Sequence, residues 1–555
     1  MLYLRMNQIN TASKIFAATP SNSSAITMSK AFAYRWGIFP LWLILTATIF
    51  FRNPIPIDET RYLSVAWEMW LRGDHLVPYL NGLPYSHKPP LLFWLFECGW
   101  ALLGGVNEWW PRLVGPICAL FNLLLIRHLA SKLWPDDTLV ALKAPWVLIG
   151  TLLWTLFATS TMFDILLTCC VLLAMIGLYE AATDASSKGW RYFAVAIGLG
   201  LLAKGPVILL HLLPTALLVF VWSQSSRMRK TVWYGSLVLA ILAGALIGLA
   251  WAIPAALSGG DDYASAILWH QTADRTVNTK IHARSFSWYF PFVPLMIFPW
   301  LTWPRLWQNL RLASLKQDNG LRFCLVWLLS TLLIFSALPS KQIHYLIPIL
   351  PAFALICARI LCHLDEQRNI KPELMPALFM ALIGIFLVLL PQVPGLSKLN
   401  WVQLVEPYWG AGVSIIALSL AGLVVHFRKL SVMSLTTALV GSVFIGFIFF
   451  FQYTGLQYNL RPAALMIKSY NEQQIPTAFV GDYQGQFHFL GRLTQPLQVI
   501  TLNDTSAWAE QHPNGYLIYL EKNQAEQAAY IQPHREHWLI FRNASQVLSL
   551  NQSKT

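Results

Sequence analysis

The sequence predicts an all-α polytopic membrane protein with about 13 transmembrane helices and a small C-terminal α/β domain on the periplasmic side. Of its 555 residues, 56% are hydrophobic and only 12% are charged, whereas a soluble domain carries about 25% charged residues. The mean hydropathy is +0.50, and several apolar runs reach the roughly 20 residues that span a bilayer. The region 454–555 differs, because short strand-like runs replace the long apolar ones.

The N-terminal segment 1–33 is rich in Ser, Thr and Asn and has no uninterrupted apolar core, which predicts a cytoplasmic tail rather than a signal peptide. Residues 34–453 alternate apolar runs with short polar connections, which predicts the transmembrane domain. The expected spans lie near residues 34–51, 110–130, 139–157, 162–182, 191–203, 206–222, 231–257, 287–303, 321–338, 344–363, 375–391, 409–427 and 432–453.

The positive charges predict which side of the membrane each connection faces. The net charge of +13 comes from short clusters between apolar runs, a pattern typical of cytoplasmic loops and not of a nucleic-acid site. With the N-terminus inside, the cytoplasmic connections are "RHLASK" (127–132), "SSKGWR" (186–191), "RMRK" (227–230), "PRLWQNLRLASLK" (304–316), "DEQRNIK" (365–371) and "RK" (428–429).

The apolar stretch 89–105 is long, but we do not expect it to span the membrane. If it crossed the bilayer, every basic cluster would move to the outer side, against the positive-inside bias. We therefore expect this stretch to lie at the outer interface, with Pro89 and Pro90 at its entry. Residues 52–109 then form one long loop on the outer side, and the C-terminal region lies on the outer side as well.

In the C-terminal region 454–555, apolar and polar residues alternate as they do in the strands of a small sheet. Four runs read as short strands, and one between them reads as a helix. The expected strands are "TAFVGDYQGQFHFLG" (477–491), "LQVITL" (497–502), "GYLIYLEK" (515–522) and "HWLIFRN" (537–543), and the expected helix is "NQAEQAAYI" (523–531).

Ionisable and aromatic residues from five segments are predicted to meet at the outer membrane face. Each has an ordinary alternative: a lone aspartate at a helix start is commonly a cap, and cations near span ends commonly snorkel. Together they are candidates for a functional site, because ionisable groups near a membrane core are costly. The candidates are Asp58, Glu59, Tyr62, Tyr85, His87, Lys88, Asp164, Lys204, His270, Arg275 and Tyr345.

This mixture suits a phosphate-bearing lipid headgroup. Lys88 and Arg275 can neutralise a phosphate, and His270 and Tyr345 can donate hydrogen bonds. A carboxylate such as Asp58 can accept the proton of an acceptor hydroxyl. Cations are also needed where a sugar-phosphate leaving group develops charge. The sequence contains no P-loop, GxGxxG or HExxH motif.

At these residues the sequence resembles a known family. "DETRY" (58–62) and "LNGLPYSHKPPLLFWL" (80–95) are similar to the first outer loop of lipid-phosphate-sugar glycosyltransferases with the C-type membrane fold. This superfamily contains the lipid A aminoarabinose transferases (ArnT) and the protein O-mannosyltransferases. The resemblance covers roughly residues 34–365 and continues through "TMFDILL", "GLGLLAKGPV", "WHQTADR", "FSWYFPFVPLMIFPW" and "SKQIHYLIPILP".

The resemblance implies a bacterial inner-membrane enzyme that uses a sugar on undecaprenyl phosphate and acts on the periplasmic face. It implies catalytic roles for Asp58, Lys88 and Arg275, with Tyr345 near the lipid phosphate and Tyr62, Tyr85 and Asp164 lining the same cavity. Glu59, Lys204 and His270 complete the predicted substrate-binding set.

One departure from the family concerns metal binding. This chain has "HKPP" at 87–90, where the lipid A transferases have a glutamate that the family associates with zinc, shared with the histidine matching His270. His87 can still ligate zinc. We therefore expect no required cofactor, and His87 and His270 as the candidate ligands if zinc binds.

The sequence thus predicts a glycosyltransferase that moves a sugar from undecaprenyl phosphate to lipid A or another envelope glycan. The first alternative is transfer to protein hydroxyls by the same fold. The second is a transporter or flippase for a lipid-linked sugar, which would place charges at mid-span and repeat its halves. No nucleic-acid partner is expected.

Overall fold

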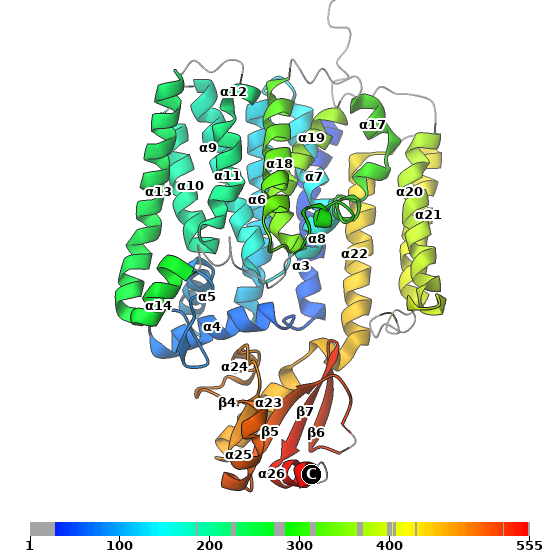
Figure 1. The fold of residues 1–555 in the computed structure, drawn as a ribbon. Helices are drawn as coiled ribbons and strands as arrows, with labels where there is room; N and C mark the ends of the chain where they lie inside the picture. The colour runs from blue at the N-terminus through cyan, green and yellow to red at the C-terminus, as the bar shows by residue number, and fades with distance from the viewer. Residues whose placement is uncertain are drawn as a thin grey trace, which may run out of the picture.

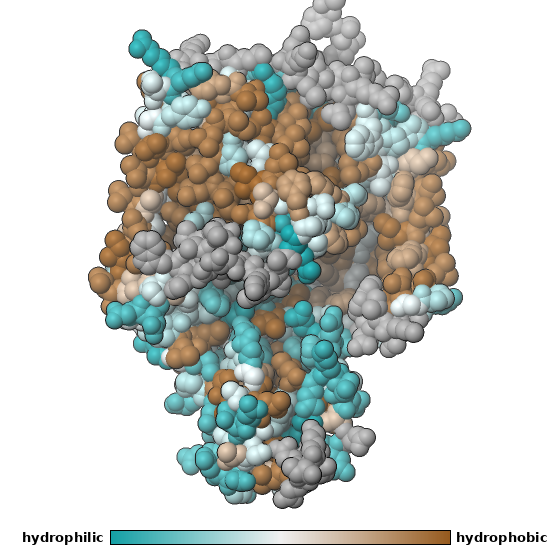
Figure 2. All heavy atoms as spheres, in the orientation of Figure 1, coloured by the Kyte–Doolittle hydropathy of each residue, from teal (hydrophilic) through white to brown (hydrophobic). Residues whose placement is uncertain are grey.

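The computed structural model of the chain is a helical bundle with a mixed sheet at one end (Figure 1). It describes residues 28–184, 187–223, 229–270, 284–310, 318–362, 370–396, 402, 407–427, 430–525 and 527–552. Hydrophobic residues cover the visible sides of the bundle, whereas hydrophilic residues predominate around the sheet (Figure 2). The molecule is therefore a polytopic membrane protein with a polar C-terminal region.

Within the described residues, nine helical segments are long and apolar enough to cross a membrane. These segments are Ala31–Phe51, Trp109–Leu133, Phe163–Asp184, Lys230–Gly259, Asn319–Ala337, Ile343–Ile360, Lys371–Gln392, Pro407–Phe427 and Val432–Glu472. Further apolar helices are shorter, among them α7 (Thr138–Ile149) and α11 (Val207–Leu217). The helical membrane fold is confirmed, but the expected count of about 13 spans is not.

The bundle is built from the following helices: α2 (Met28–Trp36), α3 (Ile38–Ala47), α6 (Trp109–Leu133), α7, α8 (Leu152–Phe157), α9 (Phe163–Asp184), α10 (Ser187–Lys204), α11, α12 (Val219–Trp222), α13 (Lys230–Gly259), α14 (Asp261–Ser265), α16 (Val293–Met296), α17 (Pro304–Leu310), α18 (Asn319–Ala337), α19 (Leu350–Ile360), α20 (Lys371–Leu389), α21 (Pro407–Phe427) and α22 (Val432–Thr454). A 3₁₀ segment, η6 (Ile343–Ile349), leads into α19.

Helices α9 and α10 form an antiparallel pair that brings the start of one beside the end of the other. Glycines permit their close contact, because a Cβ on Gly177 would lie 2.5 Å from the carbonyl oxygen of Gly189. Small residues commonly allow such approaches between membrane helices. The pairing places Asp164, at the start of α9, beside Lys204, at the end of α10.

The long first loop folds against the end of the bundle. Helix α4 (Asp58–Arg72) lies across this end, followed by a short hairpin of β1 (Tyr79–Leu80) and β2 (Leu83–Pro84) and then by α5 (Leu91–Leu102) (Figure 1). At 1.5 Å per residue, the 12 residues of α5 extend only about 18 Å. Helix α5 is thus too short to span, as expected for 89–105.

The C-terminal region is a three-layer α/β unit around a five-stranded sheet of order β4-β3-β5-β7-β6. Strand β3 (Thr477–Val480) is parallel to β4 (Gln498–Ile500) and β5 (Tyr516–Glu521), whereas β7 (His537–Asn543) is antiparallel to β5 and β6 (Tyr530–His534). Its helices are α23 (Arg461–Glu472), α24 (His488–Gly491), α25 (Thr505–Gln511) and α26 (Ala544–Gln552).

Alternating strand residues cover the two faces of this sheet. Ala478, Leu517 and Ile540 pack with Trp508 of α25 and Val547 of α26. The residues between them face the other way, and the Phe541 ring lies 6.5 Å from that of Tyr470 on α23. This period of two is the usual one for a strand covered on both faces.

The α/β character of this region is confirmed, but two predicted elements are wrong. The strand expected over 477–491 ends at Val480, and α24 occupies His488–Gly491. We expected a helix over 523–531, whereas Tyr530 and Ile531 begin β6 and pair with Phe541 and Ile540. The alanines and glutamines of this run favour a helix locally, but the β6–β7 pairing overrides that preference. Helices α25 and α26 were not predicted.

Candidate functional site

The first turn of α4 carries two adjacent carboxylates that point to different environments. The Asp58 side chain is 47% exposed, whereas that of Glu59 is 2% exposed. Both suit the positive end of a helix. Only Asp58 remains accessible to a substrate.

Glu59 anchors the loop to the bundle. Arg52 donates two hydrogen bonds to its carboxylate, at 2.6 and 3.0 Å. The backbone N–H groups of Ile55 and Thr161 donate two more, at 2.7 and 2.8 Å. Burial alone would raise the pKa of Glu59, but Arg52 and these N–H groups hold it below its ordinary value. The structure thus does not bring Glu59 into the polar cluster.

Asp58 is held by its own helix turn. Its Oδ1 accepts from the guanidinium of Arg61, and the Tyr62 hydroxyl lies 3.4 Å from the same oxygen. The other end of the Arg61 guanidinium donates to Oε1 of Gln484 at 2.8 Å. The C-terminal unit therefore contributes to orienting the candidate base.

A polar cluster of Lys88, Asp164, Lys204, His344 and Tyr345 lies beside Asp58. Lys204 Nζ donates to Asp164 Oδ1 at 2.5 Å and lies 4.9 Å from the centre of the Tyr345 ring. Asp164 is close enough to interact electrostatically with Lys88 and His344 as well. His344 also feels the charge of Asp58. Segments that are distant in sequence thus meet as the family resemblance implies.

An aromatic wall supports this cluster. The rings of Tyr62 and Phe163 meet edge to face with centroids 4.9 Å apart, and Phe93 lies 5.6 Å from Phe163. Lys88 Nζ lies 5.6 Å from the Phe163 ring centre. Tyr85 is buried, with its ring 6.5 Å from that of Phe93. These contacts bring Lys88, Tyr62 and Tyr85 to one place.

Three further candidates are not part of the described cluster. Arg275 and the side chain of His270 lie outside the described residues. His87 is exposed, and its ring lies 5.2 Å from that of Tyr85. Among the described residues no group of three potential ligands is placed to hold a metal ion. The proposed zinc ligands His87 and His270 therefore stay a prediction.

Sequence reasoning missed Gln484 and the role of Arg52. Gln484 comes from a region of the chain 423 residues after Arg61, and no local motif marks it. Arg52 follows the first span, where a snorkelling cation is the ordinary reading. The signal available for Arg52 was the carboxylate of Glu59, seven residues later, because a buried charge needs a partner.

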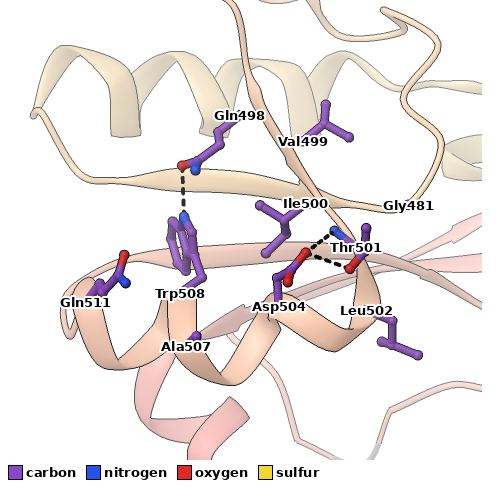
Figure 3. A pocket seen from close by; sticks show the side chains of 10 residues that line it. All are labelled: Gly481, Gln498, Val499, Ile500, Thr501, Leu502, Asp504, Ala507, Trp508 and Gln511. Carbon is purple, nitrogen blue, oxygen red and sulfur yellow. Dashed lines mark hydrogen bonds between the residues drawn. The ribbon is translucent and has the colours of Figure 1, made fainter.

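A separate cavity of ≈ 540 Å³ lies in the C-terminal unit between β4 and α25 (Figure 3). Its polar side chains bind one another: Asp504 accepts from Thr501, and Trp508 Nε1 donates to Gln498 Oε1 at 2.8 Å. None of the candidate residues lines it. The cavity is therefore distinct from the polar cluster.

The chain is similar to known proteins in sequence. Residues 87–251 match the family described as dolichyl-phosphate-mannose-protein mannosyltransferase. A curated relative from Pseudomonas fluorescens (strain Pf0-1), an undecaprenyl phosphate-alpha-4-amino-4-deoxy-L-arabinose arabinosyl transferase, is 27% identical over 73% of this chain and 70% of its own length. A relative of that description from Pseudomonas aeruginosa (strain UCBPP-PA14) is 32% identical, over 55% of each chain.

Solved structures show the same fold over nearly the whole chain. The crystal structure of ArnT from Cupriavidus metallidurans bound to undecaprenyl phosphate has a TM-score of 0.73 and 17% identity, and covers 93% of this chain and 98% of that one. Its apo state has a TM-score of 0.74. The match includes both the membrane bundle and the C-terminal unit.

Proposed function

We propose that the chain is a member of the superfamily of ArnT and the protein mannosyltransferases, to which it is similar, and that it is a glycosyltransferase using a sugar on undecaprenyl phosphate. The observation that carries this proposal is the meeting of a half-exposed Asp58 with the buried Asp164–Lys204 pair, Lys88 and His344 at one end of the bundle. This arrangement supports a lipid phosphate and an acceptor at the same site.

In the proposed reaction, Asp58 accepts the proton of an acceptor hydroxyl while the hydroxyl oxygen bonds to the anomeric carbon of the sugar. The bond from that carbon to the phosphate oxygen breaks, and its electron pair leaves with undecaprenyl phosphate. Lys88 and Arg275 neutralise the negative charge that develops on this phosphate. The hydrogen bond from Arg61 orients the Asp58 carboxylate.

The acceptor in this proposal is lipid A or another envelope glycan on the periplasmic side of the inner membrane. The descriptions of the Pseudomonas relatives support an aminoarabinose donor. The description of the matched family supports a protein acceptor as the second candidate. Arg61, which binds Asp58, also donates to Gln484 of the C-terminal unit, and this link supports a role of the unit in acceptor choice.

Purified enzyme offered undecaprenyl-phosphate aminoarabinose tests the proposal. Lipid A and a Ser/Thr-containing peptide serve as alternative acceptors, and mass spectrometry measures the added sugar. We expect lipid A to gain the mass of one or more sugars. Sugar on the peptide alone would select the second candidate. Movement of intact donor across proteoliposomes, with no sugar on either acceptor, would support a flippase instead.

A further inference from the structure

A second pocket lies at the end of the bundle opposite the polar cluster. Its volume is ≈ 830 Å³. Helix α6 starts at Trp109, near the first loop, and its 25 residues rise about 37 Å to Leu133 beside this pocket. The pocket therefore opens toward the other face of the membrane. It is lined by Met28, Ala31, Phe32, Arg35, Trp36, Leu124, Arg127, His128, Ser131, Trp134, Pro135, Thr138, Ala141 and Leu142.

The pocket is positively charged and holds no carboxylate. Arg35, Arg127 and His128 line it, and the two arginines are close enough to repel each other. In the described part of the chain no hydrogen bond or ion pair joins either guanidinium to another residue. Residues 1–27 contain no Asp or Glu. Two like charges brought together in this way favour a bound anion.

Two carboxylates of the adjoining loops are engaged elsewhere, and a third, Asp136, is exposed and does not line the pocket. Asp137 accepts from Arg359 Nη1 at 2.8 Å. Asp318 accepts from Arg359 Nε at 2.8 Å and from Trp134 Nε1 at 2.9 Å. Neither aspartate lines the pocket. The positive charge of Arg35 and Arg127 is thus not balanced by these groups.

The rim of the pocket is apolar and faces the surroundings of the bundle. Met28, Phe32, Trp36 and Leu124 are 90%, 65%, 50% and 43% exposed. From the pocket a narrow crevice continues along α3 and α6, sharing Arg35, Leu124, Arg127 and Leu142 with it and adding Ile38, Phe39 and Leu120. Acyl chains extending from a headgroup between the arginines would lie along this apolar surface.

We propose that the pocket binds an anionic phospholipid, with its phosphate between Arg35 and Arg127 and its acyl chains along α3 and α6. The geometry favours a lipid over free phosphate because the cations and the exposed apolar rim are continuous. Basic pockets between membrane helices commonly bind the headgroups of anionic lipids. This site is separated by the length of α6 from the polar cluster and does not rest on the function proposed for it.

Lipid retention by the full-length protein tests this site. Protein in nanodiscs or detergent is titrated with phosphatidylglycerol, and native mass spectrometry counts bound lipid, with phosphatidylcholine as the zwitterionic reference. We expect tighter binding of phosphatidylglycerol, and about thirtyfold weaker binding by Arg35→Gln/Arg127→Gln. Excess inorganic phosphate should not displace the lipid. Complete displacement by phosphate would show that the site recognises the anion alone and would overturn the lipid assignment.

Two further variants separate a specific site from general charge attraction. Arg191→Gln/Arg229→Gln removes two exposed cations from the same end of the bundle and should leave retention unchanged. Ala31→Trp keeps both pocket arginines and fills the space between α2 and α6, so it should lower retention. If the Arg191/Arg229 variant loses as much lipid as the pocket variant, or Ala31→Trp retains all of it, the pocket is not the binding site.

Discussion

Asp58 and Glu59 are neighbours in the chain, but their different surroundings indicate different roles. Asp58→Asn keeps the shape of the side chain and removes its ability to accept a proton. We expect donor binding to persist and sugar transfer to fall about a hundred- to ten-thousandfold, as is typical when a general base is lost. Donor binding and single-turnover transfer by the purified variant measure the two effects separately. Wild-type transfer by Asp58→Asn would exclude Asp58 as the base.

Glu59→Gln is the matched variant one residue later. It leaves the Arg52 guanidinium buried without its carboxylate, and breaking a buried ion pair commonly costs about 3–5 kcal/mol of stability. We expect a lower thermal unfolding midpoint, and transfer that falls only with the folded fraction. A variant as stable as wild type that has lost transfer would place Glu59 in the reaction.

In the proposed reaction, Lys88 and Arg275 stabilise the leaving group. Lys88→Ala and Arg275→Ala should each reduce transfer about a hundredfold or more, because each removes a charge that stabilises the departing phosphate. Membrane insertion and the unfolding midpoint should be unchanged. Steady-state transfer by purified Lys88→Ala provides the measurement, and near-normal turnover would remove Lys88 from this role.

At the scale of single elements, α5 carries a carboxyl group in an unusual setting. Burial raises the pKa of Glu97 to about 7, although His75, whose Nδ1 lies 3.1 Å from Glu97 Oε1, opposes part of this rise. The folded state therefore holds a proton that the unfolded state releases between pH 4.5 and about 7. The free energy of unfolding should decrease as the pH rises through this window and level off above it.

Glu97→Gln should remove this pH dependence. One pKa unit corresponds to about 1.4 kcal/mol, so the wild-type loss between pH 4.5 and 7 is about 3 kcal/mol. Unfolding midpoints at pH 5 and pH 8 measure it. His75→Gln is the control, because it keeps the carboxyl group and removes the residue that opposes the rise in the Glu97 pKa, so the loss of stability should persist and extend to higher pH. An equal slope in Glu97→Gln and wild type would contradict the assignment.

The sequence predicted the helices and strands whose formation depends on the local pattern of residues. Apolar length predicted the long helices. The basic clusters predicted that α5 does not span, and α5 is a short helix of 12 residues. The helix expected over 523–531 failed because β6 gains its stability from pairing with β7, a contact that local propensity does not contain. For the same reason, the contact between Arg61 and Gln484 had no sequence signal.

At the scale of the whole molecule, the first loop and the C-terminal unit lie at the same end of the bundle. Trp67 Nε1 donates to the carbonyl oxygen of Leu493 at 2.8 Å, and the N–H of Phe489 donates to Ser64 Oγ at 3.0 Å. Arg461, at the start of α23, binds Glu108 just before α6. The side that this end faces in the cell was predicted from charge alone.

Cysteine labelling tests that orientation. In a Cys98→Ser background, which removes the exposed native cysteine, Asn107→Cys and Leu502→Cys should both react with an impermeant reagent in intact spheroplasts. Asp136→Cys, at the other end of the bundle, should react only after permeabilisation. Protection of either periplasmic site, or labelling of residue 136 in intact spheroplasts, would contradict the predicted topology.

The contacts between α4 and the C-terminal unit also determine when the site can form during biosynthesis. Trp67 and its partner Leu493 are 426 residues apart, and translation adds about 5–20 residues per second. The first loop therefore leaves the ribosome roughly 20–85 s before the backbone it will bind exists. Through this interval Arg61 lacks Gln484, and the side chain of Trp67 has no carbonyl of Leu493 to bind. The candidate base reaches its final setting only when the last fifth of the polypeptide has folded, so a ribosome that stops early leaves a membrane-inserted bundle whose site is incomplete.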